Sequence, residues 1–343
     1  MKHKLEQTVF IKAILMVLVI LGHSVAFWSG DWFTKNPLYQ SQSLNALYVW
    51  LSSFHVFAFT LVSGYIFAFK IRGGGYSSYK SFLLNKTKRL LIPYVFVANI
   101  WVIPISVLTM KIGIKDILWK YVLATNPSQL WFLWMLFGVF AIVWPIWNLM
   151  SRKPLTGWAV SLGIFAIGVV GNYFLPNVFC IWTACQFVPF FFSGSRIRVK
   201  EEQSNSLLIE KVPVVGWILM DIVLLVAFLF VVEMGGLLGS ILYIGIGFIL
   251  HIVGAIMAWR VLQWLGSKVN RRETIVFKLF TSYSMPMYLF HQQLIYFTII
   301  ALNGKVSPWI NAGANFVVAI IGSLLISIVL MHWKTTRMLI GEK

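Results

Sequence analysis

The first long apolar run of the chain, residues 8–28, constrains the fold more than any other feature. It reads TVFIKAILMVLVILGHSVAFW and is about 20 residues long, which is the length that an α-helix needs to cross a bilayer. It is too long for the core of a signal peptide, so we expect the mature protein to retain it. Similar runs follow along the whole chain, which is 59% hydrophobic and only 11% charged.

These runs predict an all-α integral membrane protein with about ten transmembrane helices. The expected spans are residues 8–28, 44–69, 90–109, 130–150, 155–175, 178–194, 212–232, 237–259, 279–301 and 312–333. The segments between them are too short to build a core of their own, so we expect a single transmembrane domain over residues 1–343.

The distribution of positive charge predicts how the chain is oriented in the membrane. With the N-terminus placed in the cytoplasm, the cytoplasmic segments hold every Lys and Arg except Lys35, Lys111, Lys115, Lys120 and Lys305. The positive-inside rule then predicts that the N-terminus and the C-terminus are both cytoplasmic. The same rule explains the net charge of +18, so we expect membrane lipids and no nucleic acid as partners.

Two ionisable residues interrupt the first span, Lys12 near its start and His23 near its end. Their spacing is close to a whole number of helical turns, so both side chains lie on one face with roughly 16 Å of rise between them. Ionisable groups are costly inside a membrane unless they face a polar interior. We predict that this helix forms one wall of an active-site cavity, although Lys12 could instead extend to the interface as a simple anchor.

Four other ionisable residues fall at membrane depth, namely His55, Asp221, His251 and His291. Such groups are candidate functional residues, but each can also serve only as a hydrogen-bonding partner between helices. His55 and His291 fit either interpretation, and His251 is more typical of a structural histidine. A hydrogen bond to a neighbouring Ser, Thr or Trp would explain Asp221.

Cys180 and Cys185 lie within one apolar run and on different helix faces. They form neither a disulfide framework nor a metal site, so we expect them to serve in packing and expect no bound metal.

The stretch Lys86-Thr87-Lys88-Arg89 precedes a Leu-Leu-Ile-Pro-Tyr run. Lys86 and Arg89 are three positions apart and therefore neighbours on one helix face. Arg offers a planar fork and Lys a point charge, and both suit phosphate oxygens. Ordinary positive-inside anchoring explains the same charges. The nearby Gly73-Gly74-Gly75 lacks the Lys-Ser/Thr of a P-loop, and we interpret it as a turn.

Several tryptophans are expected near the outer face: Trp28, Trp32, Trp131 and Trp182. Tryptophan is enriched at both membrane interfaces, which is the simplest explanation for this placement. The same rings could stack on a sugar, with Asp31 beside them as an acceptor for a hydroxyl.

With these segments in view, the sequence resembles the multi-pass acyltransferases that O-acetylate bacterial cell-surface glycans. Lys12 and His23 in IKAILMVLVILGH match the family's pattern of a basic residue and a histidine in the first helix. The segment FHVFAFTLVSGYIF, with His55, Ser63 and Tyr65, is similar to the family's second helix.

Further matching segments follow in the same order as in the family. They are Lys86 and Arg89 before LLIPY, LWFL with Trp131, PFFFSG, and MYLFH ending at His291. The order and spacing of the segments over nearly the whole chain carry the resemblance. The chain departs from the family's pattern at Lys12, where Arg is usual, and at Phe57 and Gln292, where Pro is common. These departures affect local geometry and the choice of acceptor more than the class of reaction.

The resemblance implies an acyl-CoA-dependent O-acyltransferase of the bacterial cytoplasmic membrane. Acetyl-CoA would be a co-substrate, with no permanently bound cofactor, and its phosphates would contact Lys86 and Arg89. His23 would act as general base on a hydroxyl of a glycan or lipid-linked sugar, or would carry the acetyl group itself, with Lys12 below it in the cavity. Possible lining residues of the pocket are His55, Ser63, Tyr65, Trp131 and His291.

Two other functions are compatible with a multi-pass chain. A transporter or flippase for a small anion or a lipid-linked sugar could use Asp221 and the histidines as proton relays. The absence of a visible inverted repeat argues against it. A membrane scaffold without chemistry would leave the intramembrane pair Lys12 and His23 unexplained.

Overall fold

The computed structural model describes residues 2–30, 32–75, 78–203, 208–268 and 275–342. Over these residues the chain is almost entirely helical and has no β-strand. The elements are α1 (Lys2–Val25), η1 (Ala26–Ser29), α2 (Gln42–Arg72), α3 (Tyr79–Lys86), η2 (Thr87–Leu91), α4 (Ile92–Val97), η3 (Ala98–Val102), α5 (Ile103–Met110), α6 (Ile114–Asp116), η4 (Ile117–Val122), η5 (Ser128–Leu130), α7 (Trp131–Arg152), α8 (Pro154–Phe174), η6 (Val178–Cys180), α9 (Ile181–Glu202), α10 (Leu208–Lys211), α11 (Val214–Val232), α12 (Gly236–Lys268), α13 (Ile275–Leu302), α14 (Pro308–His332) and α15 (Lys334–Leu339).

The helices confirm the predicted all-α membrane fold. In the described part of the chain, nine helical segments are long and apolar enough to cross a bilayer. The tenth expected span, residues 279–301, forms the long helix α13 but is not among the nine. Its middle carries His291, Gln292 and Gln293 in succession, and these polar side chains lower its hydropathy. All three are buried, so α13 has a polar centre that faces protein and not lipid.

The expected third span, residues 90–109, is part of a longer helical segment. Helices α3, α4 and α5 are continuous with one another through two π-helical turns, η2 and η3, and together cover Tyr79–Met110. A π-helical turn holds an extra residue, which shifts the register of the faces, and such turns are frequent at functional sites. The basic stretch 86–89 therefore lies within a membrane-spanning helical segment and not in a loop before it.

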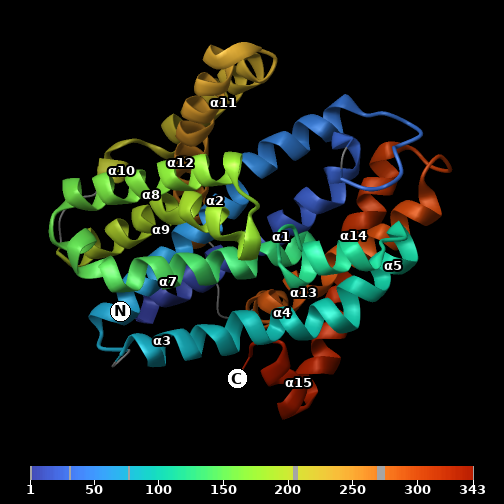
Figure 1. Cartoon of the computed structure of the whole chain (residues 1–343), viewed down its shortest axis with the longest axis horizontal. Coiled ribbons are helices and arrows are strands. Elements are labelled where there is room, and N and C mark those ends of the chain that lie inside the picture. The colour runs from blue at the N-terminus through green and yellow to red at the C-terminus, as the bar shows by residue number, and fades with distance from the viewer. Residues whose placement is uncertain (1, 31, 76–77, 204–207, 269–274, 343) are drawn as a thin grey trace.

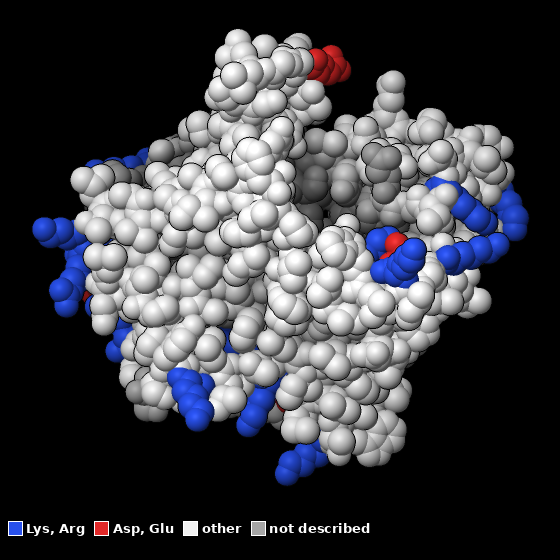
Figure 2. Space-filling view, in the orientation of Figure 1, with Lys and Arg blue, Asp and Glu red and all other residues white. Residues whose placement is uncertain are grey.

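The surface of the molecule has the character expected of a protein in lipid. In Figure 2 the Lys and Arg side chains gather toward the edges, and most of the face between them is uncharged. Large apolar side chains of the described residues are exposed to the surroundings, for example Leu155 at 83% and Leu237 at 79%. Such exposure would be costly in water, whereas lipid tails solvate these side chains.

The buried side chains form two hydrophobic clusters that meet along α2. One cluster draws mainly on α1, α2, α12, α13 and α14, and the other on α4, α7 and α9 together with parts of α2 and α13. In Figure 1, α7, α8 and α9 lie together on one side and α13 and α14 on the other, with α1 and α2 between them.

A pair of glycines brings α2 and α9 into direct backbone contact. A Cβ atom at Gly64 would lie 1.8 Å from the carbonyl oxygen of Phe191, and one at Gly194 would lie 1.8 Å from that of Leu61. Ser195 adds a hydrogen bond, its hydroxyl donating to the carbonyl oxygen of Gly64 over 3.0 Å. The Ser-Gly-Tyr and Phe-Ser-Gly segments thus have a packing function, because only glycine allows this approach.

We expect Gly64→Ala to destabilise the protein, because neither helix backbone can move away from the added methyl group without losing contacts along its length. Overpacking of this kind typically costs about 1–3 kcal/mol. Gly163→Ala in α8 is the matched control, since nothing lies within 4 Å of its Cβ position. Thermal unfolding of both variants in detergent measures the difference, and equal melting temperatures would contradict the packing role.

Candidate functional site

A cavity of about 810 Å³ is lined by residues of both hydrophobic clusters. We call the side of the bundle where α1 begins and α2 ends the terminal side, and the opposite side, where α1 ends and α2 begins, the far side. The cavity is lined toward the terminal side by Lys12, Lys70, Lys86, Arg89 and Glu342, and toward the far side by Trp32, Lys120, Asn126 and Ser128. His23 and Lys12 both line it, as the spacing in α1 predicts.

The terminal end of the cavity is basic. Its cations are near enough to one another to interact electrostatically: Lys12, Lys70, Lys86 and Arg89. The Lys86 ammonium nitrogen lies 3.6 Å from the centre of the Phe140 ring, a cation–π contact that fixes its place. Lys88 is exposed and is not a lining residue. Lys86 and Arg89 therefore face the cavity while the basic residue between them does not.

The chain segment after α15 brings a carboxyl group to these cations. Gly341 packs against η2 and the start of α4, where an added Cβ atom would lie 2.7 Å from the carbonyl oxygen of Arg89 and 2.8 Å from Pro93 Cγ, and its φ of +80° favours glycine. Glu342 follows and lines the cavity. Burial raises the pKa of the Glu342 carboxyl, while Arg89 and Lys12 act in the opposite direction. The terminal end thus contains an acidic partner for its positive charges.

His23 and His291 form a direct hydrogen bond. Nδ1 of His23 lies 2.6 Å from Nε2 of His291, and Nδ1 of His291 lies 2.7 Å from the carbonyl oxygen of Tyr288. A carbonyl oxygen only accepts, so His291 Nδ1 carries the proton, and its Nε2 accepts from His23 Nδ1 if both rings are neutral. This assignment leaves the lone pair of His23 Nε2 available as a base.

His55 lies beside this pair. Its ring packs against Gly22, the residue before His23, where an added Cβ atom would lie in ordinary van der Waals contact, 3.7 Å from His55 Cε1. His55 Nδ1 is hydrogen-bonded to the carbonyl oxygen of Leu51 one turn earlier, and the ring lines the cavity. The site therefore contains three histidines, of which His23 and His55 face the cavity. His291, which was expected in the lining, lies instead behind His23 with no exposed surface.

The far end of the cavity has an aromatic and polar wall that the sequence analysis did not assemble. The Trp32 ring lies 6.0 Å from that of His23 and 5.2 Å from that of Tyr296, measured between ring centres. The side-chain amide of Gln292 contacts Ser128 and Tyr296. A pattern could have indicated this wall, since Gln292 and Tyr296 are four positions apart in a membrane-spanning helix and so share a face.

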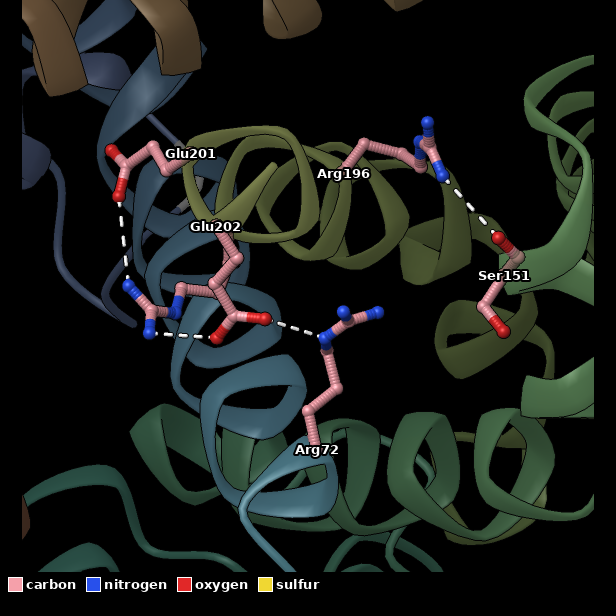
Figure 3. Close-up of polar contacts among 6 residues, drawn as sticks. Arg72, Ser151, Arg196, Glu201 and Glu202 are labelled. Atoms are coloured by element: carbon pink, nitrogen blue, oxygen red, sulfur yellow. Dashed lines mark hydrogen bonds and ion pairs between the residues drawn. The ribbon is translucent and has the colours of Figure 1, made fainter. Parts of the chain in front are cut away.

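Two of the other expected lining residues, Ser63 and Trp131, face the cavity. Tyr65 does not, which corrects the expectation for this residue. Its hydroxyl donates to Glu201 Oε2 over 2.7 Å, and it borders a separate small cavity. Glu201 and Glu202 lie together near the end of α9, where Glu202 also pairs with Arg72 of α2 at 2.5 Å (Figure 3). Tyr65 thus belongs to an ionic network that joins α2 to α9 on the terminal side.

The remaining intramembrane groups have structural partners. The Trp50 indole donates to Asp221 Oδ2 over 3.2 Å, which is the hydrogen bond to a neighbouring tryptophan that would explain this aspartate. His251 Nδ1 lies 2.7 Å from the carbonyl oxygen of Ser53. The His251 ring stacks on Phe57, which lines the cavity, but His251 itself does not line it. Trp28 is buried in the protein, so its ring does not face lipid, and Asp31 lies outside the described residues.

Cys180 and Cys185 are free and buried, in agreement with a role in packing. Within the described ranges, no group of three His, Cys, Asp or Glu residues could hold a metal ion.

Comparison with known proteins identifies the kind of chemistry. Residues 10–332 match the family model described as an acyltransferase domain. No curated protein and no solved structure matches this chain significantly. Because the match covers nearly the whole chain, the protein belongs to this family of multi-pass membrane acyltransferases.

We expect His291→Leu to lower acyl-transfer turnover on the order of 10²-fold, because the His23 ring then loses the acceptor that holds its tautomer. His291→Gln should recover part of the turnover, since its amide oxygen can accept the same hydrogen bond. His251→Leu is the control, a partly buried histidine that does not line the cavity. Equal turnover per folded molecule in the two Leu variants would show that His291 has only a packing role.

Proposed function

We propose that this member of the acyltransferase family transfers an acetyl group from acetyl-CoA to a hydroxyl of a cell-surface glycan or of its lipid-linked precursor. We place it in the bacterial cytoplasmic membrane with the terminal side in the cytoplasm. One observation carries the proposal: a single cavity joins a cluster of cations near the terminal side to a histidine pair nearer the far side.

The basic end suits the phosphates of the donor. Arg89 offers a planar fork for phosphate oxygens and Lys86 a desolvated point charge, and both face the cavity. Acetyl-CoA would displace Glu342 from these cations, because its phosphates carry more negative charge than one carboxylate. The pantetheine arm would then extend past the aromatic side chains of the middle region, among them Phe132 and Phe187.

Lys12 lies between the donor phosphates and His23 in this arrangement. Its ammonium group lines the same face of α1, and roughly 16 Å of helical rise separates it from His23. A slender acyl-bearing arm can cover such a distance, whereas the bulky nucleotide stays at the basic end. Lys12 would supply positive charge along the path of the donor.

The chemistry follows from the lone pair of His23 Nε2. The acceptor O–H gives its proton to this nitrogen as the oxygen attacks the thioester carbonyl carbon. The C–S bond breaks, and the CoA sulfur leaves and takes the proton from His23. The same nitrogen could instead attack the thioester carbonyl carbon, so that the C–S bond breaks and CoA leaves as the thiolate. In a second step the acceptor oxygen attacks the acetyl carbon, the C–N bond to His23 breaks, and the acceptor proton is passed through the freed Nε2 to the thiolate. Both routes require His291 to hold the opposite side of the ring.

The direct test is the release of CoA from acetyl-CoA by detergent-purified protein, measured as free thiol. We expect His23→Ala to reduce this release by about 10²–10⁴-fold with unchanged folding, because the imidazole supplies proton transfer and not packing. Wild-type turnover in the variant would make His23 structural. A flippase would bind and cleave no acetyl-CoA at all.

The basic stretch gives an internally controlled experiment. Lys86→Ala and Arg89→Ala should each weaken acetyl-CoA binding roughly ten- to a hundred-fold, because each loses a charge-assisted contact. Lys88→Ala should bind the donor like wild type, since Lys88 is exposed outside the cavity. Titration of the three purified variants decides the matter: three small and similar effects would leave the stretch as a topological anchor.

Variants of Lys12 distinguish a charge that acts in the cavity from a charge that only anchors the helix at the membrane interface. Lys12→Arg should keep activity because the positive charge remains in the cavity, and Lys12→Ala should lose it. Turnover at matched membrane expression is the measurement, and equal activity of the two variants would indicate an anchor.

A further inference from the structure

Four side chains at the far end of the cavity form one continuous surface beside His23. We call this surface the far wall; it consists of Trp32, Ser128, Gln292 and Tyr296, all of which line the cavity. The Gln292 amide nitrogen lies 3.0 Å from the Ser128 hydroxyl oxygen and 2.5 Å from that of Tyr296. Trp32 stands against both Tyr296 and His23.

Gln292 has an unsatisfied hydrogen-bonding atom. Its side chain is 4% exposed, and its amide oxygen has no partner in the part of the chain that the structure describes. If the amide is turned over, the oxygen accepts from Ser128 and Tyr296, and the nitrogen is then without an acceptor. In either orientation one polar atom of this cavity-lining side chain lacks a protein partner among the described residues. Buried polar groups are usually satisfied, so this atom indicates a ligand.

A hydroxyl group is the ligand that fits both orientations, because it can donate and accept. The far wall itself is uncharged. Lys120, the cation that lines this end of the cavity, is 3.3 Å from Asp116 and so has its own counter-ion. An aromatic face next to neutral hydrogen-bonding groups suits a sugar ring, with its apolar face on one side and its hydroxyls at the rim.

The position of the far wall relates it to the reacting group. Trp32 connects the far wall to the reacting group, because its ring centre lies 6.0 Å from that of His23 and 5.2 Å from that of Tyr296. A sugar ring stacked on Trp32 therefore lies beside His23, while the donor reaches His23 from the basic end.

We propose that the far wall binds the sugar ring of the acceptor: Ser128, Gln292 and Tyr296 hold a hydroxyl next to the one that is acylated, and Trp32 stacks on the ring. This inference rests on the proposed function, since an acceptor is needed only if the protein transfers an acyl group. Beyond the proposed function, it identifies the residues that select the acceptor.

The test uses methyl glycosides of glucose, galactose, mannose and rhamnose as acceptors, each compared with its monodeoxy analogues. CoA release from acetyl-CoA gives kcat/KM for each. A site that hydrogen-bonds a hydroxyl rejects the analogue that lacks it, so we expect wild type to prefer one glycoside over one deoxy analogue by about tenfold or more. Gln292→Leu and Tyr296→Phe should each bring this ratio close to one.

Tyr79→Phe is the control, because the Tyr79 hydroxyl makes a comparable hydrogen bond, to the carbonyl oxygen of Ala141 over 2.9 Å, outside the cavity. It should keep the wild-type ratio. An unchanged ratio in Gln292→Leu and Tyr296→Phe overturns the far wall as the acceptor site. So does a wild-type enzyme that cleaves acetyl-CoA at a rate that no glycoside increases. Absence of any CoA release by wild type would instead overturn the proposed function itself, and this inference with it.

Discussion

Lipid offers no hydrogen-bond partner, so every polar group inside this bundle has to find one within the protein. Helix α13 shows most clearly how the structure meets this constraint. His291 bonds to His23, and Gln293 exchanges hydrogen bonds with Gln129 over 2.7 and 3.0 Å. These bonds hold α13 against α1 and against the turn η5 at once. The orientation of the His23 ring, the base in the proposed mechanism, is thus a by-product of satisfying the polar centre of one helix.

Sequence reasoning predicted what depends on local periodicity. The helical membrane fold, the shared face of Lys12 and His23, and the shared face of Lys86 and Arg89 all follow from helix geometry. The bond between His23 and His291 joins residues 268 positions apart, and no periodicity relates such positions. The π-helical turns were not predicted for a different reason. The extra residue in such a turn changes the hydrogen-bonding pattern of the backbone but requires no particular type of amino acid.

The tyrosine of the Ser-Gly-Tyr segment shows a second limit of sequence reasoning. The segment marks the second helix correctly, but Tyr65 points to the ionic network of α9 and its neighbouring glycine makes the helix contact. A segment typical of a family identifies where helices meet as readily as where substrates bind. Only the partner atoms, which come from α9 more than a hundred positions away, distinguish the two.

The cations at the terminal end have a consequence for the membrane as a whole. A cavity lined by residues near both sides of a bilayer is a potential path for ions. Positive charges fixed inside such a path repel protons and metal cations, as they do in selective pores. Lys12, Lys70, Lys86 and Arg89 occupy the cavity at this level, and the carboxyl of Glu342 offsets only part of their charge. The charges that suit an anionic donor therefore also oppose a proton leak through the protein that carries them.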